Sequence, residues 1–110
     1  VPNVSNSGNS TLYAVPAGAS SAALESIVIG ITMANKTSSG ITASIFIDNE
    51  DGSNDVYIVK DASIPAGSSL EVMSGNKLVL QNDGTNGDNL EALCSAASSL
   101  DVTVSVLEDV

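Results

Sequence analysis

The acidic segment at residues 48–55 holds the densest group of possible cation ligands in the chain. It reads Asp-Asn-Glu-Asp-Gly-Ser-Asn-Asp, and carboxylate and amide oxygens are the ligands that Ca²⁺ prefers. An EF-hand loop needs glycine at its sixth position and carboxylates at its first and twelfth. With Gly52 sixth, the first and twelfth residues are Ile47 and Ile58, and the polar stretch at residues 82–88 fails the same test. Both segments therefore predict solvated hairpin loops, with an irregular cation site as the alternative.

The chain lacks the groups that support nucleophilic catalysis. It contains no His, and its single cysteine is Cys94, whereas a Ser or Cys nucleophile normally needs a neighbouring base. Paired carboxylates can hydrolyse a glycoside, but such sites normally include aromatic platforms, and the chain has one Phe, two Tyr and no Trp. We therefore predict that the protein is not an enzyme and has no catalytic residue, cofactor or metal site. Cys94 and Met73 are expected to fill core volume.

The chain is strongly acidic. Its 13 Asp and Glu residues outnumber three Lys, Arg is absent, and the formal net charge is -10. Such a surface repels phosphate backbones and anionic lipids, and without Arg the chain lacks the planar group that grips phosphates in bidentate fashion. We expect no nucleic-acid partner and no membrane partner. A lone cysteine also rules out a disulfide within the chain.

Apolar residues alternate with polar ones along much of the chain, which is the pattern of strands with one buried face. Turn-forming residues separate these stretches at the short spacing that is typical of antiparallel sandwiches. Together they predict an all-β domain, an antiparallel β-sandwich of about eight strands with jelly-roll or immunoglobulin-like topology. The three clearest strands, which we expect to face one core, carry Ile27, Ile29, Ile31 and Met33; Ile41, Ala43, Ile45 and Ile47; and Leu100, Val102, Val104 and Val106. The five shorter ones span residues 12–15, 56–60, 70–73, 77–80 and 89–95.

One segment also fits a helix. Leu90, Leu93, Cys94, Ala97 and Leu100 recur at helical spacing, and the sequence Leu-Glu-Ala-Leu has high helix propensity. A helical turn within residues 89–100 is therefore the alternative to a strand there.

The motif Pro-Ala-Gly occurs twice, at residues 16–18 and at residues 65–67. Proline fixes its φ at about -65°, and glycine is favoured at the fourth place of a type I turn. We therefore expect type I turns at residues 15–18 and 64–67. Because proline cannot donate a hydrogen bond to a strand ladder, each turn is expected to end one strand and carry the chain to the other sheet.

Residues 1–10 differ in composition from the rest of the chain. They are Asn, Ser and Gly with one Pro and two Val, and they offer little apolar surface to offset the entropy lost on ordering. We predict a flexible N-terminal arm at residues 1–10 that only a partner orders. A single domain at residues 11–110 follows, since a chain of 110 residues matches one core.

Five stretches occur in an order that is known from one group of proteins. They are Tyr-Ala-Val-Pro-Ala-Gly at residues 13–18, the Tyr-to-Glu stretch at residues 57–71, Asn-Lys-Leu-Val-Leu at residues 76–80, Gly-Asp-Asn-Leu at residues 87–90 and Ser-Val-Leu-Glu at residues 105–108. With them, residues 11–108 resemble small β-sandwich virion structural proteins of tailed bacteriophages, especially phages of aquatic bacteria. These signatures are structural, and no catalytic residue follows from the resemblance.

The resemblance implies a structural protein of the phage virion. We expect a capsid decoration or cement protein that stabilises the head by binding between capsomers, with the major capsid protein or other virion proteins as partners and a homo-trimer as its oligomer. The negative charge favours the outer surface of the particle over a position facing packaged DNA. A neck or tail structural component is the first alternative.

A carbohydrate- or receptor-binding surface module is the alternative from another class. Such a module needs exposed aromatic side chains, and Tyr13, Phe46 and Tyr57 are the three available. A bacterial surface or matrix domain that shares the fold without the function is a further alternative.

Overall fold

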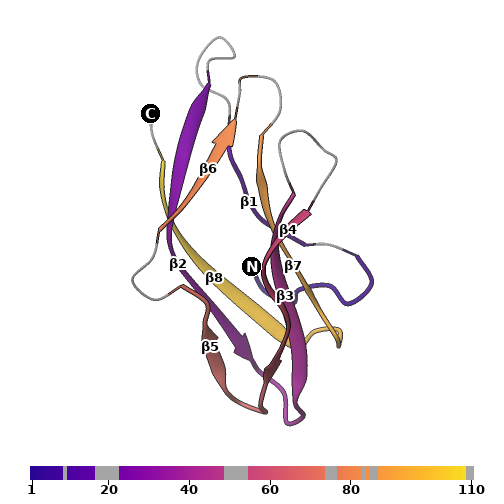
Figure 1. Cartoon of the computed structure of the whole chain (residues 1–110). Coiled ribbons are helices and arrows are strands. Elements are labelled where there is room, and N and C mark those ends of the chain that lie inside the picture. The colour runs from indigo at the N-terminus through magenta and orange to yellow at the C-terminus, as the bar shows by residue number, and fades with distance from the viewer. Residues whose placement is uncertain are drawn as a thin grey trace.

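The chain forms eight β-strands in a computed structural model, which describes residues 1–8, 10–16, 23–48, 55–73, 77–82, 84 and 87–108 (Figure 1). No helix occurs in these ranges, so the predicted all-β fold is confirmed. The helical alternative within residues 89–100 is wrong, because that region holds a strand, a turn and the start of the next strand. The strands are β1 (Ser10–Ala14), β2 (Leu24–Asn35), β3 (Ile41–Asp48), β4 (Asp55–Ile64), β5 (Ser69–Glu71), β6 (Leu78–Asn82), β7 (Asn89–Cys94) and β8 (Leu100–Glu108).

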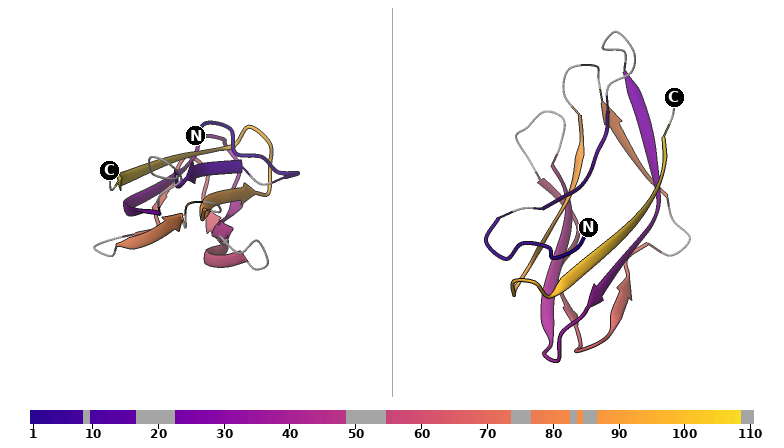
Figure 2. Two further views of the ribbon diagram at one scale, coloured as in Figure 1. Left: turned by 90° about the horizontal axis from the view of Figure 1, so that it is seen from above. Right: turned by 180° about the vertical axis from the view of Figure 1, so that it is seen from behind.

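The strands form two antiparallel sheets that pack together as a β-sandwich (Figures 1 and 2). Sheet A has the order β1-β7-β3-β4. In sheet B the long strand β2 is central: β8 pairs along one edge, and β5 and β6 follow one another along the other. Only the β3–β4 and β5–β6 connections stay within one sheet, so the other connections cross between the layers and tie them together.

The core lies between the two sheets and consists mainly of aliphatic side chains. Because successive residues of a strand point to opposite faces, each strand contributes every second residue to this layer. The inward alternation that the sequence predicts for β3 and β8 is confirmed by the burial of their apolar residues. The buried cluster comprises Val4, Val15, Val28, Ile31, Met33, Ile41, Ala43, Ile45, Ile64, Met73, Leu80, Leu90, Ala92, Cys94, Leu100 and Val102.

The expectation for β2 is correct in one half of the strand and wrong in the other. Ile31 and Met33 are fully buried as predicted, but Ile29 is 51% exposed while Val28 is fully buried. Between the two halves the pairing with β8 shifts by one residue, which marks a β-bulge. An extra residue reverses the alternation of faces. Ile27 and Ile29 therefore lie on the outer face of sheet B.

The second Pro-Ala-Gly motif carries the chain from sheet A to sheet B, as predicted, because it joins β4 to β5. Its geometry differs from the expected type I turn. The Ser68 N–H donates to the Pro65 carbonyl at 3.1 Å, so Pro65 is first in the turn and Gly67 is third, with φ of +66°. Type II turns reserve that third position for glycine. The first motif falls in the sequence between β1 of sheet A and β2 of sheet B, and its residues 17 and 18 lie outside the described residues.

Residues 1–5, the N-terminal segment, contact the domain and do not form the expected arm. Val4 has no exposed surface, and its N–H donates to the Leu100 carbonyl at 2.9 Å. The Val102 N–H donates to the Val1 carbonyl at 2.9 Å, and the Val1 amino group donates back to Val102. Figure 2 shows the segment beside the first half of β8. Pairing with this strand edge and burial of one valine stabilise a stretch whose composition offers little apolar surface.

Candidate functional site

The described residues contain no group of three or more His, Cys, Asp or Glu side chains that could hold a metal ion. The two polar loops of the sequence are described only in part, since residues 49–54, 83, 85 and 86 lie outside the described ranges. In the same part of the chain, no helix is long and apolar enough to cross a membrane. What the described chain does present is an apolar face on sheet B.

Two strand partners bring a second and a third apolar residue beside Ile27 on this face. The Cα partner of Ile27 is Leu107 on β8 at one side and Val79 on β6 at the other. Leu107 is 61% exposed and Val79 50% exposed. Directly paired residues are nearest neighbours on one face of a sheet, so the three side chains form a row across β8, β2 and β6. We call this row, together with Ile29, the outer stripe.

The outer stripe is confined to one end of sheet B. Farther along β2 and β8, the exposed residues are Thr32, Thr103 and Ser105, which are ordinary for a face in water. Single exposed apolar residues need no explanation, but a contiguous apolar patch with a polar border is typical of an interaction site. The stripe is therefore the candidate functional surface.

Two carboxylates border the stripe. Glu25 precedes Ile27 by two positions and shares its face of β2, and Glu108 follows Leu107 at the end of β8. These four residues line one shallow groove that is open to solvent, and both glutamates are exposed. The groove thus combines an apolar floor with a negative rim.

Tyr13 connects the two sheets beside this groove. Its phenol reaches from β1 to the Ser26 Oγ at 2.9 Å and donates a hydrogen bond to the Glu108 carboxylate. Because the phenol has a single proton, the Ser26 hydroxyl is the donor in the other bond. Burial, and then the neighbouring Glu108 carboxylate, raise the pKa of Tyr13 from its ordinary value of 10.0. Tyr13 is therefore protonated at neutral pH and holds Glu108 at the rim.

The aromatic residues do not form an open platform for a sugar ring. Phe46 is only 2% exposed, and its ring centroid lies 5.2 Å from that of Tyr57. Tyr57 is 46% exposed, but the Lys60 Nζ lies 5.1 Å from its ring centroid. The one half-exposed ring of this pair is thus already in contact with a cation and a second ring.

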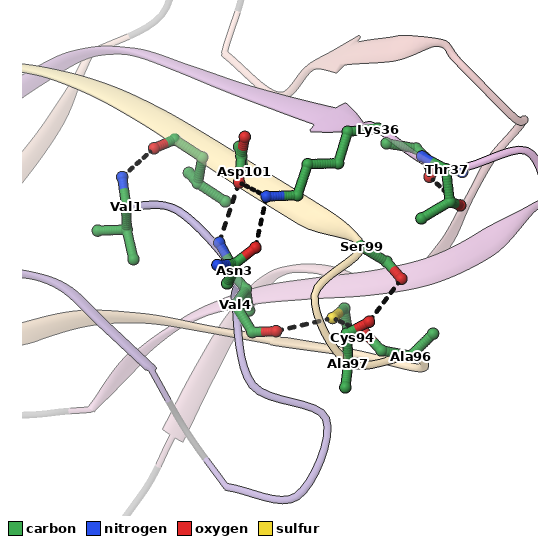
Figure 3. A network of polar contacts seen from close by, with 12 residues as sticks. Val1, Asn3, Val4, Lys36, Thr37, Cys94, Ala96, Ala97, Ser99 and Asp101 are labelled. Atoms are coloured by element: carbon green, nitrogen blue, oxygen red, sulfur yellow. Dashed lines mark hydrogen bonds and ion pairs between the residues drawn. The ribbon is translucent and has the colours of Figure 1, made fainter.

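A second polar network fastens the N-terminal segment to the end of β2 and to β8 (Figure 3). Asp101 Oδ1 accepts hydrogen bonds from the Asn3 backbone N–H at 2.9 Å and from the Lys36 Nζ at 3.0 Å. Lys36 also donates to the side-chain oxygen of Asn3. The Asn3 N–H, and after it the Lys36 ammonium, hold the pKa of Asp101 below its ordinary value. This network occupies one of the three lysines of the chain.

Cys94 anchors the other end of the segment. It is a buried free cysteine, its Sγ lies 3.3 Å from the Val4 carbonyl oxygen and 3.0 Å from that of Ala96, and its N–H donates to the Ser5 carbonyl at 3.1 Å. Met73 is 7% exposed. The expected core positions of Cys94 and Met73 are thus confirmed.

Sequence reasoning assigned Ile27 and Ile29 to the core and did not single out Val79 or Leu107. Two signals were available. β6 contains Leu-Val-Leu at residues 78–80 and β8 ends in Val-Leu-Glu, and since neighbouring residues alternate faces, part of each apolar run must point outward. An isolated glycine within a strand pattern, here Gly30, also indicates a bulge.

Comparison with protein-family models, with curated proteins and with solved structures found no match to this chain. The outer stripe offers apolar surface for burial and carboxylates for ion pairing, which are the elements of a binding surface.

Proposed function

We propose that this chain is a structural protein of a tailed-phage virion, namely a capsid decoration or cement protein that stabilises the head by binding between capsomers. The observation that carries the proposal is the outer stripe, in which Ile29, Val79 and Leu107 are at least half-exposed on a folded sandwich that has a separate buried core. The resemblance of residues 11–108 to phage virion sandwich proteins supports the same assignment. The net charge of -10 favours the outer surface of the particle, away from packaged DNA.

Such a protein works by burying surface and not by turnover. Covering one half-exposed aliphatic side chain contributes on the order of 1 kcal/mol. Ile29, Val79 and Leu107 are at least half-exposed and Ile27 is less so, so the outer stripe contributes at most about 4 kcal/mol. A free energy of about 4 kcal/mol corresponds to a dissociation constant of roughly 1 mM, which is weak for one copy. A homo-trimer presents three stripes to the lattice, and linked sites multiply affinity without new contacts. This arithmetic favours the trimer over a monomer.

The test is the location and the copy number of the protein in purified particles. Mass spectrometry of virions and a reconstruction of the head are expected to find it on the outer surface, in numbers that scale with the number of capsomers. A low copy number at the neck or along the tail would assign it to the alternative virion position. Absence from purified particles would overturn the proposal.

A further inference from the structure

We propose that the outer stripe docks onto a protein surface that presents apolar side chains flanked by Lys or Arg. The inference rests on the proposed function and names the chemistry of the capsid surface that the stripe contacts. In this complex the apolar groups of the partner cover Ile27 and Leu107, and its cations pair with Glu25 and Glu108.

The charge of the rim is the first reason for a cationic partner. The groove is lined by two glutamates and two aliphatic residues, and the β6 neighbour of Glu25 is the neutral Gln81. A partner that covers the apolar floor also removes water from the carboxylates beside it. Carboxylates that lose water without gaining a cation oppose binding. Lysine or arginine at the border of the partner surface removes this penalty.

The second reason is that a second copy of this chain is poorly suited to the stripe. Lys36 is bound to Asp101, and Lys60 lies over the Tyr57 ring, so two of the three lysines already make contacts within the chain. Two copies that met through their stripes would bring both pairs of rim carboxylates into one interface. Lys77, which is exposed and lies two residues before Val79, would supply one cation on each side against two carboxylates. Like charges in one interface repel, and this repulsion disfavours a contact between two copies of the chain through their stripes.

The two kinds of partner respond to salt with opposite signs. Attraction between an acidic rim and a basic partner is screened by ions, so affinity falls as ionic strength rises. Repulsion between two acidic copies is screened in the same way, so self-association through the stripe strengthens with salt. The sign of the salt dependence therefore identifies the occupant without any mutation.

The experiment uses the intact protein and heads of the encoding phage that lack it. Co-sedimentation is measured at about 0.05 M and about 0.5 M NaCl, between which the Debye length falls from roughly 14 Å to roughly 4 Å. We expect binding at low salt and a loss of affinity of about fivefold or more at high salt. Sedimentation of the protein alone, at the same two salt concentrations, reports self-association.

Two sets of variants, each with a matched control, locate the effect on the stripe. The double variant Glu25→Gln and Glu108→Gln is expected to weaken binding about fivefold at low salt and to reduce the salt dependence. Its control is Glu71→Gln, an exposed glutamate on β5 at the far end of sheet B, which should bind as the parent does. For the apolar part of the outer stripe, Val79→Thr should weaken binding, whereas Val56→Thr should not, although the two valines are 50% and 51% exposed.

The possible outcomes distinguish the inference about the stripe from the proposed function. Binding that weakens with salt and depends on the two rim glutamates supports the inference. Binding that is indifferent to salt and to these glutamates overturns the inference and leaves the proposed function in place. Self-association that strengthens with salt and is lost in Val79→Thr assigns the stripe to a second copy and also overturns the inference. Failure of the parent protein to bind heads at either salt concentration overturns the proposed function and the inference with it.

Discussion

The N-terminal segment and the outer stripe reverse the behaviour that their compositions lead one to expect. The segment belongs to the polar stretch at residues 1–10, yet it places Val4 in the core with no exposed surface, whereas β2 is apolar, yet it leaves Ile29 51% exposed. In these two regions, burial follows backbone pairing and strand phase more closely than local hydrophobicity.

Each reversal has a local cause. The edge of β8 offers backbone groups at Leu100 and Val102, and the N-terminal segment satisfies them by hydrogen bonding. In β2, a single extra residue at the bulge exchanges the two faces of the strand. A strand edge can thus order a sequence of mostly polar composition, and a bulge can leave apolar side chains exposed.

The largest expected effect on stability comes from deleting single residues at and beyond the bulge of β2. Ile29 is its extra residue, because Val28 and Gly30 pair with consecutive residues of β8. Deleting Ile29 restores regular alternation and leaves every inward residue inward, so we expect the free energy of unfolding to fall by about 1 kcal/mol or less. Deleting Thr32 from the regular part of the strand would turn one half of β2 inside out, and we expect that variant not to fold.

Circular dichroism and urea titration of the two deletion variants provide the measurement. The deletion of Ile29 should retain a cooperative transition, and the deletion of Thr32 should lack one. If both variants unfold, or if the deletion of Ile29 is the worse of the two, the bulge is not what places the stripe outside.

Two alanine variants, one in the N-terminal segment and one in the outer stripe, compare the burial of the two regions through a smaller loss of stability. Val4→Ala removes buried carbon atoms and leaves a cavity, which is expected to cost about 2 kcal/mol. Ile29→Ala removes more carbon atoms from an exposed site, and it is expected to cost about 0.5 kcal/mol or less. Thermal melts should therefore separate the two variants by several degrees. Equal losses, or a greater loss for Ile29→Ala, would contradict the assignment of the two regions.

Much of the fold followed from alternation in the sequence, because the residues that the period-two pattern selects in β3 and β8 are buried or packed against the core. The crossing between sheets after β4 also followed from a motif, since proline ends a strand. The position of that turn did not follow from the motif, because Pro-Ala-Gly fits a turn that begins at Ile64 as well as one that begins at Pro65. The φ of +66° at Gly67 decides between them, and only the three-dimensional contacts of the loop set it.

The candidate site was harder to predict, for two physical reasons. A bulge depends on how two distant strands share their hydrogen bonds, and the only local signal for it was Gly30. Docking of the N-terminal segment depends on the free edge of β8, which lies about 100 residues away in sequence. Composition describes the cost of ordering such a segment, but it does not reveal which partner groups the fold leaves open.

The smallest expected effect is the response of the N-terminal segment to acid. Asp101, a titratable residue, accepts hydrogen bonds from Asn3 of this segment and from Lys36, so protonation should loosen the segment and leave the outer stripe in place. The Asn3 N–H and the Lys36 ammonium lower the pKa of Asp101 from its ordinary value of 3.8. A lowered pKa means that the folded state favours the carboxylate. Its contribution is therefore complete above the ordinary pKa and is lost as pH falls through the lowered one. Protonation of other carboxylates over this range reduces the net negative charge and relieves repulsion, so a global melt would mix opposing trends.

A local probe avoids this mixture. In NMR spectra recorded across the acid range, the amide proton of Asn3 is expected to shift with a midpoint below 3.8, because its acceptor is the Asp101 carboxylate. The amide of Val4, which donates to a backbone carbonyl, should shift far less. In the variant Asp101→Asn the titration of Asn3 should disappear while Val4 stays protected from exchange, since backbone pairing and burial still hold the segment. A midpoint at or above the ordinary value, or a titration that persists in Asp101→Asn, would show that the charged network does not fasten the segment.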